Sequence, residues 1–274
     1  MAFIDGAMKN DPEAQHKLGV CYAQGLGVEK DEKQAFSWIL KAANQGYAPA
    51  QNSMGYCYKN ETGVVRDMTQ AFMWWKKAAD QGYADAQKNI GYCYSYGAGV
   101  DEDQSLAVYW WIKAAEQGDA ESQNELGFCY RDGKGVKQNA QQAFMWWQKA
   151  ALQDNVYALN SLGHCYDKGF GVDKNPSEAF VWWKKAADLG FLDAIVSVAF
   201  CYLYGNGVEK NQPIAAYWLF QAAEKGHAQS QYCLAICYRE GIGFKKDYSK
   251  YKEWLQKAAD QGDENAIKEL NGIH

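Results

Sequence analysis

Eight cysteines are the residues with the most chemical potential, because thiols can form disulfides or bind a metal. Seven stand 36 residues apart, at Cys21, Cys57, Cys93, Cys129, Cys165, Cys201 and Cys237, and the eighth is Cys233. Thiols at one position of successive packed helices lie about 8–10 Å apart, whereas a disulfide needs Cα atoms within about 7 Å. We therefore expect free, buried cysteines, which are typical of a reducing compartment and predict a cytoplasmic protein.

No other group of residues has the spacing of a catalytic or metal site. Cys233 and Cys237 share a helix face, but no second pair of ligands accompanies them. Ser249 and Lys252 match Ser-x-x-Lys without the Ser-Asp-Asn and Lys-Thr-Gly motifs of a penicillin-binding enzyme. The histidines form neither a zinc motif nor a triad-like group; they are His16, His164, His227 and His274. The sequence thus predicts no catalytic residue, metal or cofactor, and a hydrolytic enzyme stays an alternative.

Composition narrows the classes of partner. Of 274 residues, 48% are hydrophobic and 22% charged, which is typical of a globular protein. The net charge of −5 argues against nucleic acid as a ligand, because phosphates require a basic surface. No apolar run reaches the roughly 18 residues of a membrane span, so we expect no membrane insertion. Residues 1–6 lack the basic and apolar parts of a signal peptide.

The spacing of the cysteines belongs to an internal repeat of the whole sequence. A tyrosine follows each of the seven, and an Ala-Ala pair and a glycine keep the same step. Tryptophan recurs likewise, at Trp38, Trp74, Trp110, Trp146, Trp182, Trp218 and Trp254. We predict one solenoid domain over 1–274, with seven repeats in 11–262. Residues 1–10, with Phe3 and Ala7 in phase, form a partial cap, and 263–274, with Ala266 and Leu270 in phase, form a capping helix.

Each repeat is predicted to be a pair of helices, A and B. Helix A of the first repeat covers about Pro12 to Gln24, with Asp11 as its N-cap and glycine at its end. Helix B begins after Asp31, where all seven repeats have Asp or Asn. A lone hairpin cannot bury enough apolar surface, so neighbours must stack. The Trp-Trp pairs fit stacking if one ring faces its own helix A and the other the next repeat; a ligand cage is the alternative reading.

The motif Leu-Gly-x-Cys-Tyr, Gly-x-Gly-Val, Ala-Phe-x-Trp and Lys-Ala-Ala resembles the Sel-one-like repeat (SLR), a relative of the tetratricopeptide repeat. In the fifth repeat it reads Leu162-Gly163-His164-Cys165-Tyr166, Gly169-Phe170-Gly171-Val172, Ala179-Phe180-Val181-Trp182 and Lys185-Ala186-Ala187. The resemblance implies an all-α, right-handed superhelical solenoid whose helices A line a concave groove. It also implies an adaptor or scaffold for other proteins, without shared catalytic residues. Local departures are Ala199 and Ala235, which replace glycine.

The helix A face opposite the core stripe is where the repeats differ, and we expect it to bind a protein or peptide. Aromatic and aliphatic side chains there stand beside amide and basic ones. The predicted binding residues are Asn52, Tyr56, Lys59, Lys88, Tyr92, Asn124, Phe128, Arg131, Asn160, His164, Phe200 and Tyr232; we call them the helix A surface. Their basic and amide groups favour an acidic partner or a C-terminal carboxylate.

Two alternatives stay open for this surface. Its aromatic row (Tyr56, Tyr92, Phe128, His164 and Phe200) could pack against the preceding repeat and bind nothing. The chain could also self-associate as a structural module, through the solenoid ends or through an apolar patch near the C-terminal end. That patch comprises Val196, Phe200, Leu203, Tyr204, Tyr232 and Ile236.

Overall fold

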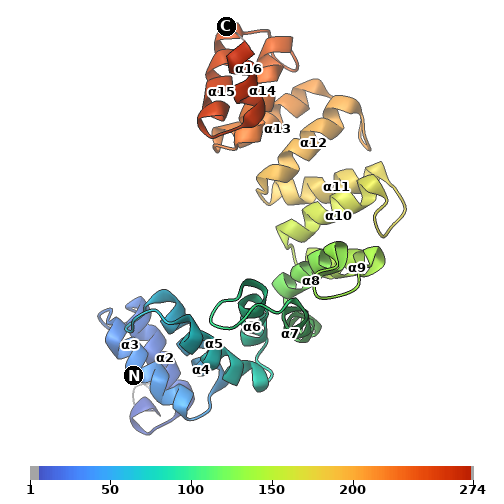
Figure 1. Ribbon diagram of the computed structural model, residues 1–274. Coiled ribbons are helices and arrows are strands. Elements are labelled where there is room, and N and C mark those ends of the chain that lie inside the picture. Colours follow the sequence, from blue (N-terminus) through green and yellow to red (C-terminus); the bar gives the residue numbers. More distant parts are fainter. Residues whose placement is uncertain (1–5, 273–274) are drawn as a thin grey trace. The chain divides into compact units, whose positions relative to one another are not determined.

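The computed structural model describes residues 6–272, which form helices joined by short loops and contain no strand (Figure 1). The helices A are α2 (Pro12–Gln24), α4 (Ala48–Asn60), α6 (Ala84–Tyr96), α8 (Ala120–Asp132), α10 (Val156–Lys168), α12 (Leu192–Tyr204) and α14 (Ala228–Glu240). The helices B are α3 (Glu32–Asn44), α5 (Met68–Asp80), α7 (Gln104–Glu116), α9 (Ala140–Ala151), α11 (Pro176–Asp188), α13 (Gln212–Glu224) and α15 (Tyr248–Asp260), and α16 (Glu264–Gly272) follows. The predicted all-α fold of seven helical hairpins is confirmed.

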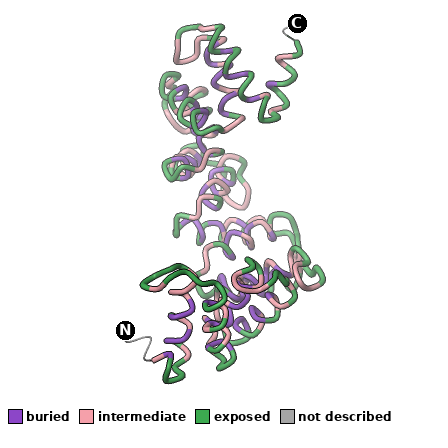
Figure 2. The backbone as a smooth tube through the Cα atoms, turned by 90° about the vertical axis from the view of Figure 1, so that its left-hand side faces the viewer, coloured by how far each residue is buried: buried purple, intermediate pink, exposed green. Residues whose placement is uncertain are grey.

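The chain forms two compact units. Unit 1 covers Met1–Asn139 and unit 2 covers Ala140–His274, so the boundary falls between the two helices of the fourth repeat. The predicted single domain over 1–274 thus contains two units. Within each unit the buried residues lie where helices face one another, and the loops are mostly exposed (Figure 2). None of the helices in the described part of the chain is long and apolar enough to cross a membrane.

The predicted caps begin and end the helices. The Asp31 carboxylate accepts hydrogen bonds from the backbone N–H groups of Lys33 at 2.9 Å and Gln34 at 3.0 Å. Asp or Asn caps α5, α7, α11, α13 and α15 in the same way. Helix α2 ends at Gly25, whose φ of 71° is the left-handed conformation that glycine adopts without strain. In the second repeat Glu61 takes that conformation instead, with φ of 61°.

Glycine within helix A allows the second tryptophan of helix B to lie against the helix backbone. A Cβ atom on Gly91 would be 2.4 Å from Trp111, and one on Gly163 would be 2.4 Å from Trp183. The second ring therefore faces helix A of its own repeat, as predicted. In repeats six and seven, where Ala199 and Ala235 replace this glycine, leucine replaces the tryptophan, at Leu219 and Leu255. The two departures compensate each other, since a smaller side chain leaves room for the added methyl group.

The first tryptophan of the pairs in repeats two and three faces the preceding repeat, which corrects the prediction that it faces the next one. Trp74 belongs to the core cluster that contains Ile39 and Ala43 of the first repeat. The Lys76 ammonium lies 5.2 Å from the centre of the Trp110 ring of the following repeat. Trp74 and Trp110 are only 8% and 7% exposed. With both rings buried in the core, the alternative of a tryptophan ligand cage is wrong.

A pair of glutamines joins successive repeats at the side of the core. The Gln87 amide donates to the Ala79 carbonyl at 3.2 Å, and its oxygen accepts from the Gln117 amide at 2.8 Å. Gln51 and Gln81 form the same contacts one repeat earlier, at 2.6 Å between the two side chains. We call this arrangement the glutamine clamp. It gives a second hydrogen bond to a carbonyl that also accepts from a backbone N–H, that of Gly82 in the case of Ala79.

The ends of the described chain pack in the predicted phase. Ala7 is 2% exposed and lies in a cluster with Ala14 and Leu18. Ala266 of α16 is fully buried in the last core cluster, against which Leu270 also packs. Phe3, the other residue assigned to the N-terminal cap, lies outside the described residues.

Candidate protein-binding surface

The aromatic row of the helix A surface stands on the second tryptophans. The Tyr56 ring meets Trp75 edge-on with ring centres 5.4 Å apart, and Tyr92 meets Trp111 at 5.5 Å. In unit 2, His164 meets Trp183 at 5.2 Å. Each pair lies within one repeat. These three rings therefore pack on their own repeat, which differs from the alternative that they pack against the preceding one.

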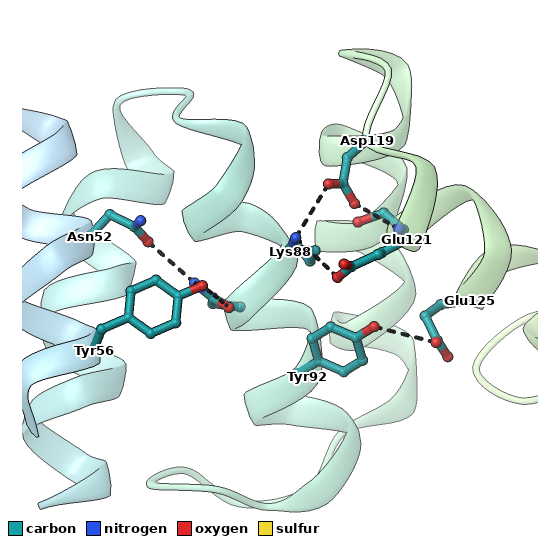
Figure 3. Close-up of polar contacts among 9 residues, drawn as sticks. Asn52, Tyr56, Lys88, Tyr92, Asp119, Glu121 and Glu125 are labelled. Atoms are coloured by element: carbon teal, nitrogen blue, oxygen red, sulfur yellow. Dashed lines mark hydrogen bonds and ion pairs between the residues drawn. The ribbon is translucent and has the colours of Figure 1, made fainter. Parts of the chain in front are cut away.

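Polar atoms of the same row reach the following repeat in unit 1 (Figure 3). The Asn89 amide donates to the Asn52 carboxamide oxygen at 3.2 Å and to the Tyr56 hydroxyl at 3.1 Å. One repeat further, the Tyr92 hydroxyl donates to the Glu125 carboxylate at 3.3 Å. These contacts join α4 to α6 and α6 to α8. We call them the tyrosine ladder; it holds the tyrosine rings in place along unit 1.

Two of the three basic residues predicted to hold a carboxylate of the partner already face carboxylates of their own chain. The Lys88 ammonium lies 3.0 Å from Glu121 and 3.5 Å from Asp119, and its side chain is only 15% exposed. The Arg131 guanidinium binds Asp132 through two hydrogen bonds, at 2.7 and 3.0 Å. Lys59 is exposed and forms no ion pair with any residue in the described ranges. Of the three predicted basic residues, Lys59 is therefore the one whose side chain is open to an acidic ligand.

The remaining predicted residues differ in accessibility. Asn52 and Asn124 are buried, at 7% and 5% exposed, so a partner could reach little of either. Asn160 is half-buried, and its carboxamide oxygen has no hydrogen-bond partner among the described residues. Phe128 is half-buried beneath the Arg131 guanidinium, 4.9 Å above its ring centre.

The predicted residues of unit 2 fall into an exposed and a paired set. His164 and Phe200 are exposed, and burial of part of the imidazole lowers the pKa of His164. The Tyr232 hydroxyl donates to Glu269 of α16 at 3.2 Å. Glu269 also pairs with Arg239. The ladder pattern of unit 1 thus recurs at the last helix.

One cavity recurs along the helix A surface. Cavity I, of about 350 Å³, opens between repeats two and three, and cavity II, of about 420 Å³, between repeats three and four. Cavity III, of about 330 Å³, opens between repeats five and six of unit 2. The walls correspond at 36-residue steps: Trp75, Trp111 and Trp183; Tyr92, Phe128 and Phe200; Cys93, Cys129 and Cys201; Lys59, Ser95 and Asp167; Tyr96, Asp132 and Tyr204.

Three residues of these walls were missed by the sequence reasoning. Asn89 and Glu125 occupy one position of helix A and accept or donate the ladder bonds, and Tyr96 lines both cavity I and cavity II while 72% exposed. The available signal was the polar residue at that position in repeats one to six, from Lys17 to Ser197. Burial raises the pKa of the Glu125 carboxyl, and the Tyr92 hydrogen bond opposes that rise in part.

The cysteines line the core beneath the cavities. All eight are free thiols, and seven belong to one helix A position. Burial raises the pKa of Cys57 to about 11 and that of Cys93 to about 12, which keeps both thiols protonated and unreactive at neutral pH. No three His, Cys, Asp or Glu side chains in the described part of the chain are grouped as metal ligands would be.

Comparison with known proteins gives this repeat a family. The family model for the Sel1 repeat matches residues 12–47, 48–83, 84–119, 120–155, 156–191, 192–227 and 228–263. A protective antigen of uropathogenic Escherichia coli with an SLR fold is 36% identical, with a TM-score of 0.91 over 97% of this chain and 57% of that chain. A Sel1 repeat protein from Oxalobacter formigenes is 33% identical, with a TM-score of 0.81 over 99% of this chain and 79% of that chain.

A more distant likeness concerns the fold alone. Yeast Tom70 is 16% identical, with a TM-score of 0.50 over 99% of this chain and 56% of that chain. The chain therefore spans 57% of the length of the E. coli antigen and a similar share of Tom70. No curated protein matches the sequence.

Proposed function

The chain belongs to the Sel1 repeat family, whose solenoids are scaffolds for protein contacts rather than enzymes, and from this premise we propose that its helix A surface binds an extended segment of another protein. The observation that carries the proposal is the recurrence of one aromatic-walled cavity at 36-residue steps. Neighbouring cavities such as I and II can take successive side chains of one bound segment, as pockets do in other peptide-binding surfaces.

The spacing of the cavities fits an extended chain. Neighbouring helices in a stack lie about 8–10 Å apart, and an extended chain advances about 3.3 Å per residue. Cavities I and II are one repeat apart in unit 1, so they would receive side chains three residues apart. Tyr96 stands between them and lines both. It is positioned to contact the partner between its two anchors.

The charges around the cavities support a partner segment whose charge changes along its length. Cavity I contains Lys59, Asn89 and Tyr92, which can hold a carboxylate, either of an acidic side chain or of a C-terminus. In cavity II the corresponding residues are Ser95, Glu125 and Phe128, and the Glu125 carboxylate disfavours a second carboxylate. The acidic preference thus applies to cavity I, and a neutral or basic residue suits cavity II.

The test compares a cavity variant with a matched variant outside the helix A surface. Tyr96→Ser combined with Lys59→Glu alters cavity I, whereas Tyr109→Ser combined with Lys113→Glu changes an exposed tyrosine and a lysine of helix B. Proteins that the native chain captures would be identified first. Their affinity for the native chain and for each variant would then be measured by titration calorimetry. We expect the first variant to weaken binding about tenfold or more and the second to leave it unchanged. Equal binding by all three proteins would show that the binding surface lies elsewhere.

Self-association is a second candidate for unit 2. Phe200 and Tyr204 are 37% and 71% exposed beside cavity III, with ring centres 6.1 Å apart. Two such patches could cover each other in a symmetric dimer. Sedimentation of the native chain against Phe200→Ser tests this candidate: a dimer that the substitution dissociates supports it, and a native monomer up to about 0.1 mM, well above common dimer affinities, removes it.

We also propose that the protein is located in a reducing compartment, the cytoplasm, which the eight free thiols support. Native chain from its own cells, alkylated before lysis, should show all eight thiols modified by mass spectrometry, and oxidised cysteines would contradict it.

A further inference from the structure

The largest of the cavities described lies away from the helix A surface, in unit 2. It has a volume of about 680 Å³ and opens between α13 of repeat six and the loop that precedes α15 of repeat seven. Its lining includes Tyr217, Phe220, Phe244 and three lysines, Lys245, Lys246 and Lys250. We call it the lysine cavity. It contains none of the residues assigned above to partner binding.

Aromatic rings form the apolar part of the lysine cavity. Phe244 stacks on Tyr238 with ring centres 4.9 Å apart and planes 15° apart, which makes a flat wall. Tyr217 and Phe220 are 57% and 37% exposed on the neighbouring helix. Single exposed aromatic residues are common on protein surfaces, but several around one concave space are typical of a binding site.

The three lysines make the rim positive. None of them forms an ion pair with another residue of the described chain, although lysines elsewhere, such as Lys184 and Lys257, do. The Lys250 ammonium lies 5.2 Å from the centre of the Tyr238 ring. The one carboxylate in the lining, that of Asp247, accepts the backbone N–H of Lys250 at 3.0 Å as a helix cap. The rim thus carries uncompensated positive charge in a chain of net charge −5.

Other repeats do not reproduce this combination. Phe244 stands where the other six repeats have valine, and Lys250 where they have Gln, Leu, Glu or Ile. Phe220 stands where they have Leu, Ile, Lys or Gln. Each of these residues is absent from six of the seven hairpins, so the fold does not require it at this place. Three departures that meet at one cavity indicate a local binding function.

We propose that the lysine cavity binds an acidic peptide segment that carries an aromatic or large aliphatic residue. The apolar side chain would pack between Phe220 and Phe244, and flanking carboxylates would meet the ammonium groups of Lys245, Lys246 and Lys250. The volume lies within the usual range of about 300–1,000 Å³ for ligand pockets. A membrane surface fits less well, because clusters that bind anionic lipid contain about four to eight basic residues, and here three surround a concave space.

The experiment uses the full chain and three fluorescein-labelled probes: Glu-Asp-Phe-Glu-Asp, its Ala counterpart and Lys-Ser-Phe-Lys-Ser. Fluorescence anisotropy would be measured with the native chain and with Lys245→Ser/Lys250→Ser, Phe220→Ser, and the control Lys174→Ser/Lys210→Ser. The control removes the same charge from two exposed lysines at the loop position of Lys246 in repeats five and six. Circular dichroism checks that every variant is folded.

We expect only the acidic, Phe-containing probe to bind the native chain and the control. The paired lysine variant should bind it about fivefold to tenfold more weakly, as expected for two exposed charge pairs, and Phe220→Ser about fivefold more weakly. Three outcomes would overturn the proposal: no binding by the native chain, equal affinity in folded variants, or equal affinity for the Ala probe. Binding to phosphatidylserine vesicles without binding to the peptide would also overturn it.

Discussion

Repeats two and three of unit 1 and repeats five and six of unit 2 use one backbone plan with different contacts between helices. In unit 1, Asn89 and Glu125 accept or donate the bonds of the tyrosine ladder. In unit 2 the row continues in α12 as Val196 and Phe200, whose side chains have no hydrogen-bonding groups. Repeats two and three are therefore joined by directional polar contacts at these positions, whereas repeats five and six have apolar side chains there.

The glutamine clamp shows the same contrast between these repeats. Gln51 and Gln87 of repeats two and three have Leu159 and Ile195 as counterparts in repeats five and six, whereas repeat seven keeps the clamp with Gln231 and Gln261. Polar bonds fix one register between helices, whereas apolar contacts tolerate several. This difference affects how a partner could be bound. Repeats two and three present rings held in fixed positions, whereas repeats five and six present exposed rings such as Phe200 that can adapt to a partner.

The largest effect on stability is expected where helix A meets the second large side chain of helix B, because some repeats have glycine against tryptophan and others have alanine against leucine. Gly91→Ala puts a Cβ atom 2.4 Å from Trp111 and should lower the free energy of unfolding by about 2–3 kcal/mol, as overpacking does. Adding Trp111→Leu copies the natural Ala199–Leu219 pair and should recover much of the loss. Urea titration of both single variants and the double variant measures the coupling. Additive losses would mean that the two positions are not compensating partners.

The next largest loss of stability is expected when one glutamine of the glutamine clamp is removed. Gln87→Leu removes two hydrogen bonds, one to the Ala79 carbonyl and one from the Gln117 amide, at a loss of about 1–2 kcal/mol. The double variant with Gln117→Leu copies Leu159 and Leu189 of repeat five and should be more stable than the single one. Thermal unfolding of the native chain, the single variant and the double variant measures this difference in stability. A double variant less stable than Gln87→Leu would show that unit 1 cannot use the apolar arrangement.

A smaller loss is expected from the tyrosine ladder. Tyr92→Phe removes the hydroxyl that donates to Glu125 and keeps the ring on Trp111, so unfolding should become easier by about 1 kcal/mol. Phe200 of unit 2 already lacks this hydroxyl. The control is Tyr204→Phe, which changes an exposed hydroxyl. Equal urea midpoints for Tyr92→Phe and the native chain would mean that the ladder bond adds nothing to stability.

Much of the fold could be predicted because its causes are local or periodic. Asp31 caps a helix through its own neighbours, and Gly25 ends one by its backbone conformation. The direction of Trp74 was predicted wrongly, because helical periodicity gives the face of a ring but not the neighbour it meets. Lys88 pairs with the carboxylates of Asp119 and Glu121, which lie more than 30 residues away in the sequence. Only the stacking of the helices reveals this contact.

The cavities could not be predicted for a related reason. Each is formed by residues of two repeats that are distant in the sequence, as Lys59, Trp75 and Tyr96 are in cavity I. The glutamines of the clamp were also missed, since glutamine in a helix usually faces solvent. Gln87 is 4% exposed because two specific partners replace its water.

The smallest expected effect is a change in pH dependence at Glu125. Burial raises the pKa of this carboxyl in the folded chain above its value in the unfolded chain, about 4.3. Protonation therefore favours the folded state: the stabilising contribution is complete below the unfolded pKa and is lost as pH rises through the folded pKa. Glu125→Gln cannot ionise, so the variant should lose less stability than the native chain between pH 4.5 and 7.

Urea midpoints measured across that pH range test the expectation. The groups around Glu125 are Tyr92, which donates to it, and Glu121, whose negative charge adds to the rise in pKa. Glu264→Gln serves as the control, because that carboxylate is 86% exposed on α16. If Glu125→Gln and Glu264→Gln follow the native chain equally, Glu125 is hydrated in solution. The tyrosine ladder would then end in an exposed carboxylate, and the contrast between the two units at this position would be one of sequence only.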